Sequence, residues 1–97
     1  MREHFFIVYD FEKNSRRTKC VKLLEKYGVR VQYSVFEFYL TSARKIELFS
    51  KMKEKEFLED IKGEAFMIVP VSQDSGRKIQ RFGNTVDVVT KAAVVSI

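Results

Sequence analysis

The side chain best placed to do chemistry is the carboxylate of Asp10. It follows an apolar run at residues 5–9, which is typical of a strand buried on both faces, and it precedes a basic segment. Sheet folds often place functional sites where the end of a strand meets the start of a helix. From position alone two interpretations stay open: a structural ion pair with neighbouring cations, or a site for a metal ion and a phosphate.

Basic side chains are concentrated directly after Asp10. Residues 13–30 hold seven Lys and Arg against one acid, Glu25, a net charge of +6, whereas the whole 97-residue chain carries +5. Such a local excess of cations indicates a polyanionic partner, nucleic acid first, although a solvated lysine surface explains it as well. The candidate nucleic-acid-binding residues are Arg16, Arg17, Lys19, Lys22, Lys26 and Arg30.

The single histidine, His4, and the single cysteine, Cys20, do not indicate catalysis. A Cys–His nucleophile needs the two side chains to be adjacent, and helical spacing turns Cys20 toward the core. We therefore expect a reduced core thiol and a surface histidine. One cysteine also excludes an internal disulfide and a four-ligand Cys/His zinc site.

A first helix is expected to position the cations. It should span about residues 16–27, with Asn14 or Ser15 as its cap and Gly28 as its stop. At about 100° per residue, an apolar and a cationic face separate. The apolar face comprises Cys20, Val21, Leu24 and Tyr27, and the cationic face comprises Arg16, Lys19, Lys22 and Lys26. Arg17 is the exception, because its angle directs it toward the core and toward the corner that holds Asp10.

The middle of the chain predicts two strands and a second helix. Residues 29–40 have a β pattern but exceed the usual three to ten residues of one strand, so we expect a break near residues 32–34. Thr41 or Ser42 should cap the helix that follows. Its interrupted apolar stripe consists of Ile46, Phe49, Met52, Phe57, Leu58 and Ile61.

The last third of the chain predicts another strand and a short tail. Residues 65–71 have the composition of a strand, and Pro70 places it at a sheet edge or at a bulge because proline cannot donate a ladder hydrogen bond. Residues 73–78 are expected to form a loop. Short β segments are expected at residues 79–82 and 85–89.

This element order predicts an α+β fold: a ferredoxin-like βαββαβ sandwich with a short C-terminal β extension. Residues 1–97 fit a single domain. The apolar tail within residues 83–97 is expected to pair with a second subunit of a homodimer. No apolar run approaches the ~20 residues of a membrane span, and the first residues lack signal-peptide features. We therefore expect a cytoplasmic protein with no membrane partner.

The residues around Asp10 also resemble a known family. Asp10, the basic residues 16–19 and the block YGVRVQYSVFE at residues 27–37 closely resemble the small CRISPR-associated adaptation proteins of the Cas-two family. The resemblance covers about residues 5–90, and the middle block is its specific part. The sequence departs from many members at Phe11 and at Phe38, where the family often has a smaller side chain.

The resemblance implies a homodimer that works with the larger CRISPR-associated integrase in spacer acquisition. It maps the family's strand-end aspartate onto Asp10, which would face its symmetry mate, hold Mg²⁺ or Mn²⁺ and be the catalytic residue. One chain offers a single well-placed acid, and a two-fold axis supplies the second. Arg16, Arg17 and Lys19 would then hold phosphate oxygens.

Several activities remain open within this resemblance. The first is a metal-dependent endonuclease/endoribonuclease that hydrolyses phosphodiester bonds of RNA or double-stranded DNA. The alternative is a non-catalytic DNA-binding adaptor that bridges the integrase subunits, with a structural Asp10. A toxin-type ribonuclease is a third, weaker hypothesis. The first and second need the basic residues, but only the nuclease needs the metal.

Overall fold

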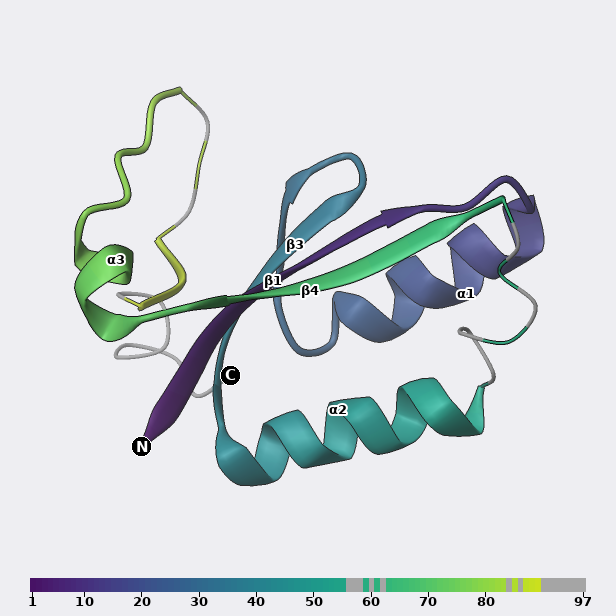
Figure 1. The fold of residues 1–97 in the computed structure, drawn as a ribbon, viewed down its shortest axis with the longest axis horizontal. Helices are drawn as coiled ribbons and strands as arrows, with labels where there is room; N and C mark the ends of the chain where they lie inside the picture. Colours follow the sequence, from purple (N-terminus) through teal and green to yellow (C-terminus); the bar gives the residue numbers. More distant parts are fainter. Residues whose placement is uncertain (56–58, 60, 62, 84, 86, 90–97) are drawn as a thin grey trace.

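A four-stranded antiparallel sheet carries helices on one of its faces (Figure 1). The computed structural model describes residues 1–55, 59, 61, 63–83, 85 and 87–89. The strands are β1 (Arg2–Asp10), β2 (Val29–Gln32), β3 (Val35–Thr41) and β4 (Ala65–Val71), in the order β2-β3-β1-β4. The helices are α1 (Asn14–Leu24), α2 (Ser42–Glu54) and the short α3 (Gln73–Arg77). The predicted α+β, ferredoxin-like order is confirmed.

The central strand β1 presents two different faces. Its core face carries Phe5, Ile7 and Tyr9, which are at most 3% exposed and pack with buried residues of α1 and α2. Its opposite face carries Phe6 and Val8, which remain half-buried in the single subunit, and the exposed Asp10. The prediction that this strand is buried on both faces is therefore right for the face that packs on the helices and wrong for the opposite face.

Three local predictions are confirmed. The break in residues 29–40 falls where expected, because β2 ends at Gln32 and β3 begins at Val35. Pro70 lies in an edge strand, since β4 pairs with β1 alone. Thr41 caps α2, where its hydroxyl oxygen accepts a hydrogen bond from the backbone N–H of Arg44 at 3.2 Å.

The boundaries of α1 differ from the prediction at both ends. The helix begins at Asn14 after Lys13, which makes no side-chain cap, and ends at Leu24. Gly28 serves a different purpose from the expected stop. A Cβ there would lie 2.6 Å from the backbone oxygen of Glu37 and 2.5 Å from the ring of Phe38, so this position needs glycine for close approach to β3.

The buried face of α2 also differs from the predicted stripe. Leu48 and Met52 are buried, one turn apart, and Phe49 packs against the core, whereas Ile46 is 70% exposed. Ile46 lies about 115° from the centre of that face at ~100° per residue, so it points to solvent. Of the last three predicted members of the stripe, Ile61 is half-buried, and residues 57 and 58 lie outside the described residues.

The segment after β4 differs most from expectation. The predicted loop at residues 73–78 contains α3, which Ser72 caps by accepting a hydrogen bond from the N–H of Ser75 at 3.0 Å. The described residues of the segments 79–82 and 85–89 form no strand, because in the isolated subunit none of them pairs with a sheet edge. Residues 90–97 lie outside the described residues. No described helix is long and apolar enough to cross a membrane.

Candidate nucleic-acid and metal site

Asp10 ends β1 on the sheet face opposite α1 and α2, and its side chain is exposed. It lies opposite Ala65 of β4 in the strand register. Its carboxylate makes no hydrogen bond or ion pair with another residue of the described part of the chain. Of the two interpretations of Asp10, the structural ion pair is therefore not formed there.

An open pocket of about 270 Å³ brings Asp10 and Arg17 together. Its lining residues are Tyr9, Asp10, Phe11, Arg17, Tyr33 and Ser34. The guanidinium of Arg17 donates to the side-chain oxygen of Asn14 at 2.7 Å and to the backbone oxygen of Phe11 at 2.8 Å. A guanidinium has five N–H donors, so others remain for a phosphate in the pocket. The predicted approach of Arg17 to the corner of Asp10 is confirmed.

The turn between β2 and β3 forms the other wall of the pocket. The backbone oxygen of Tyr33 accepts hydrogen bonds from Arg30, through Nε at 2.9 Å and Nη2 at 2.6 Å, and from the hydroxyl of Tyr9 at 3.3 Å. Burial raises the pKa of the Tyr9 hydroxyl, which favours the protonated donor. Sequence reasoning missed Tyr9 and Tyr33, although Tyr33 lies in the break that strand length predicted.

Arg16 supports the loop after β1, and its side chain is not exposed for contact with a phosphate. It forms an ion pair with Glu64, and the two side chains are only 13% and 4% exposed. Glu64 also accepts from the backbone N–H groups of Glu12 at 2.7 Å and Lys13 at 3.2 Å. Burial acts to raise the pKa of Glu64, but these N–H groups and the Arg16 charge outweigh it and lower that pKa. We therefore remove Arg16 from the candidate phosphate contacts.

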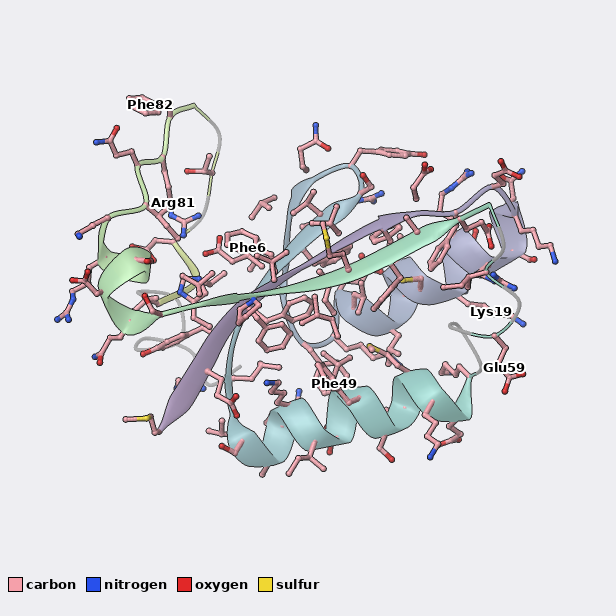
Figure 2. The ribbon with its side chains drawn as sticks, viewed as in Figure 1. Phe6, Lys19, Phe49, Glu59, Arg81 and Phe82 are labelled. Atoms are coloured by element: carbon pink, nitrogen blue, oxygen red, sulfur yellow. The ribbon has the colours of Figure 1, made fainter. Side chains whose placement is uncertain are left out.

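Lys19, which Figure 2 labels, and Lys22 are exposed on α1, and Lys26 is exposed in the turn that follows it. Their ammonium groups make no ion pair with other described residues. They remain the cations on and just after α1 that are available to a partner, as the predicted cationic face requires. Arg30, by contrast, is exposed but holds the β2–β3 turn.

The family model described as CRISPR associated protein Cas2 matches residues 3–79 of the chain. The chain belongs to the Cas2 family. The resemblance of Asp10 and the block at residues 27–37 to that family is thereby confirmed.

Relatives and structural neighbours cover different shares of this Cas2-family chain. A protein named CRISPR-associated endoribonuclease Cas2 1 of Methanospirillum hungatei is 43% identical over 54 residues, 55% of this chain and 57% of the relative. The chain thus spans little more than half the length of that relative. One named CRISPR-associated endoribonuclease Cas2 2 of Synechocystis is 32% identical over 82 residues, 84% of this chain and 86% of the relative.

A solved structure described as a partial Cas6-RT-Cas1–Cas2 complex contains a similar fold. The match has a TM-score of 0.65 and 30% identity, and it covers 81% of this chain and 89% of that chain.

A metal site in this Cas2-family subunit would rest on Asp10. The described residues contain no group of three or more His, Cys, Asp or Glu side chains that could hold a metal ion. Mg²⁺ takes oxygen ligands and is commonly bound through one or two carboxylates together with water and phosphates. The exposed carboxylate of Asp10, beside Arg17, would supply one of the two carboxylates of such a site.

A second polar cluster lies on the same sheet face as Asp10 but is buried. The Glu37 side chain is fully buried. Its carboxylate lies 2.6 Å from Nε2 of His4 and accepts hydrogen bonds from both terminal nitrogens of Arg81, each at 2.7 Å. His4 is 8% exposed, so the expected surface histidine is wrong: its place on the alternating face of β1 puts it against Glu37 and under Gly76 of α3. Cys20 is the buried thiol expected, and burial raises its pKa to about 12.

Proposed function

We propose that this chain is a homodimeric, metal-dependent endonuclease/endoribonuclease of CRISPR spacer acquisition. Asp10 binds Mg²⁺ or Mn²⁺ and is the catalytic residue for hydrolysis of phosphodiester bonds in RNA or double-stranded DNA. The observation that carries the proposal is the free carboxylate of Asp10 in a pocket shared with the guanidinium of Arg17. The endonuclease and endoribonuclease names of the relatives support it.

The sheet face that bears Asp10 supports the proposed homodimer. Phe6 and Val8 are half-buried on this face, and the register aligns them with Val69, 37% exposed, and Met67, 55% exposed. Monomers rarely leave such apolar surface open at the edge of a sheet. A two-fold axis that covers this face brings the two Asp10 carboxylates toward one another. The tail within residues 83–97 then pairs with the partner subunit.

The chain's own residues hold the substrate in this proposal. Asp10 supplies a carboxylate oxygen to the metal, and Arg17 donates its free N–H groups to a phosphate oxygen. When bound, the metal ion supplies Lewis acidity toward the phosphate and lowers the pKa of a bound water. Hydrolysis joins a water oxygen to phosphorus, breaks one P–O ester bond and leaves a proton on the departing oxygen.

A second candidate function is a non-catalytic DNA-binding adaptor that bridges the larger CRISPR-associated integrase subunits. The exposed lysines Lys19, Lys22 and Lys26 favour it, because they bind phosphate without a metal. The structural neighbour comes from a complex whose description includes Cas1. In this function Asp10 has no chemical role.

The test compares the wild-type dimer with Asp10→Asn on single-stranded RNA and on duplex DNA, with Mg²⁺, Mn²⁺ or EDTA. We expect Asp10→Asn to lose at least ~100-fold in cleavage rate, above the 10–100-fold typical of groups that only support a metal ligand. Duplex binding should survive. Asp74→Asn is the matched control, because Asp74 is exposed on α3 and, among the described residues, forms its ion pair with Lys78 alone.

Three outcomes decide between the functions. Loss in Asp10→Asn with normal activity in Asp74→Asn supports the nuclease. Full cleavage by Asp10→Asn removes Asp10 from the mechanism. A wild type that is inert under every metal and pH, yet binds duplex DNA, favours the adaptor.

A further inference from the structure

Tyr33 is a large aromatic side chain that the fold leaves in solvent. It is 67% exposed, although it belongs to a two-residue turn where small polar residues and glycine are usual. Of the large hydrophobic side chains exposed in the described residues, it alone lines the pocket of Asp10 and Arg17. Turn chemistry does not account for an aromatic ring at this position, and most of the ring is not packed against the described part of the chain.

The turn that carries Tyr33 is held rigidly. Three hydrogen bonds converge on its backbone oxygen, two from the guanidinium of Arg30 and one from the hydroxyl of Tyr9. The same guanidinium lies 4.9 Å from the centre of the Tyr33 ring and 5.9 Å from that of Phe36. Arg30 therefore fixes the turn and covers part of one face of the ring, while most of the ring stays open. A preordered aromatic surface loses little entropy when a ligand stacks on it.

We infer that Tyr33 is a stacking platform for an unpaired nucleobase, so that the pocket of Asp10 takes single-stranded nucleic acid. This inference deepens the proposed function and rests on it, because Arg17 and Asp10 would receive the phosphate beside the stacked base. Every base has a flat π-face, so stacking on tyrosine tolerates any sequence. Within a duplex the bases stack on one another and do not offer that face.

The platform separates two modes of binding on one subunit. Duplex DNA is held by backbone charge alone and meets the exposed lysines of α1. A single strand adds a base on Tyr33, with the Arg30 cation against the same ring. Tyr33 therefore contributes to single-strand affinity and leaves duplex affinity unchanged.

The experiment uses the full-length Asp10→Asn dimer without metal, so that binding is measured apart from cleavage. Single-stranded RNA and DNA oligonucleotides carry 2-aminopurine, an adenine analogue whose fluorescence is quenched when it stacks. In this background Tyr33→Ala should weaken single-strand binding about five- to 150-fold, the equivalent of ~1–3 kcal/mol per stacked base, and should relieve the quenching.

Matched variants isolate the ring. Tyr33→Phe should bind like the parent, and Tyr33→Leu, which keeps apolar bulk without a π-face, should bind like Tyr33→Ala. Phe82→Ala removes another exposed ring, 81% exposed at the tip of the segment after α3, and should change nothing (Figure 2). Melting temperatures within a few degrees of the parent show that each variant is folded.

An equal loss of single-strand and duplex affinity in Tyr33→Ala, or no loss in either, overturns the inference. So does full binding by Tyr33→Leu. The proposed nuclease is judged separately, by cleavage in the protein that retains Asp10. Single-strand binding that depends on the Tyr33 ring supports the platform even where the wild type cleaves nothing.

Discussion

The buried carboxylate of Glu37 gives a quantitative test of how the segment after α3 is anchored. Arg81 makes a bidentate pair with it, and the Arg81 side chain is 19% exposed against 0% for Glu37. The hydrogen bonds to Glu37 raise the pKa of the Arg81 guanidinium. Arg81→Met keeps most of the apolar stem but removes the charge and both donors. Glu37 then has only His4 as a partner among the described residues.

The expected destabilisation is large for a single substitution. Removing one partner of a buried ion pair costs about 3–5 kcal/mol, because the other charge stays desolvated. His4, 2.6 Å from Oε2 of Glu37, still donates a hydrogen bond, which places this case at the lower end, about 3 kcal/mol. For a chain of this length each kcal/mol lowers the melting temperature by about 4–8 °C. Arg81→Met should therefore melt about 12–24 °C below the wild type.

Thermal and urea denaturation followed by circular dichroism measure this effect, at one protein concentration because dimer stability depends on it. Arg77→Met is the control: Arg77 is exposed on α3, and its replacement should stay within about 0.5 kcal/mol of the wild type. A loss below about 1 kcal/mol in Arg81→Met would show that Glu37 is not desolvated against Arg81 in solution. The segment after α3 would then lie elsewhere, for example across a partner subunit.

Three further predictions concern the charged surface, the close approach of Gly28 to β3 and the support behind Asp10. Six exposed lysines in a dimer, Lys19, Lys22 and Lys26 of each subunit, predict a log–log salt slope of about −5 for duplex DNA. Replacing Lys19 and Lys22 by alanine should bring the slope to about −2, and an unchanged slope would move the binding surface elsewhere. Gly28→Ala should cost about 2–3 kcal/mol in urea denaturation, because the new Cβ lies 2.6 Å from a backbone oxygen, and a stable variant would refute that close approach. The pKa of Glu64 is lower in the folded chain than its ordinary value of 4.5, so the ionised carboxylate stabilises the fold at pH values above 4.5. This stabilisation is lost as the pH falls through the pKa of Glu64 in the folded chain. Glu64→Gln should therefore melt lower than the wild type at pH 7, and the difference should shrink as the pH falls below 4.5, whereas parallel melting curves across pH would contradict the assignment.

Local pattern was enough to predict most of the fold. Twelve β-forming residues cannot make one ordinary strand, so the break before Val35 followed from length alone. Pro70 cannot donate to a ladder, and this predicted its edge position. The departure from the family at Phe38 also has a local explanation, because its ring is fully buried and stacks on Phe5 with centroids 4.8 Å apart. It therefore fills the core.

The errors arose where distant residues decide the outcome. Arg16 has the helical angle of a surface cation, but it forms an ion pair with Glu64, which lies 48 positions later in the sequence. His4 has the position of a surface residue at the start of a strand, but Glu37 and Gly76 of α3 lie against it. Helical periodicity describes one element at a time and contains no information on such pairs.

The alternation of β1 ties the proposed chemistry to the proposed assembly. Side chains two residues apart on a strand share a face, so Phe6, Val8 and Asp10 point the same way. A partner that covers the two apolar side chains must also approach the carboxylate. Two carboxylates brought close repel unless a cation or a proton lies between them, so dimerisation itself favours metal binding at Asp10. The predicted linkage is that divalent metal strengthens the wild-type dimer, and that Asp10→Asn dimerises at least as well without metal but no longer responds to it.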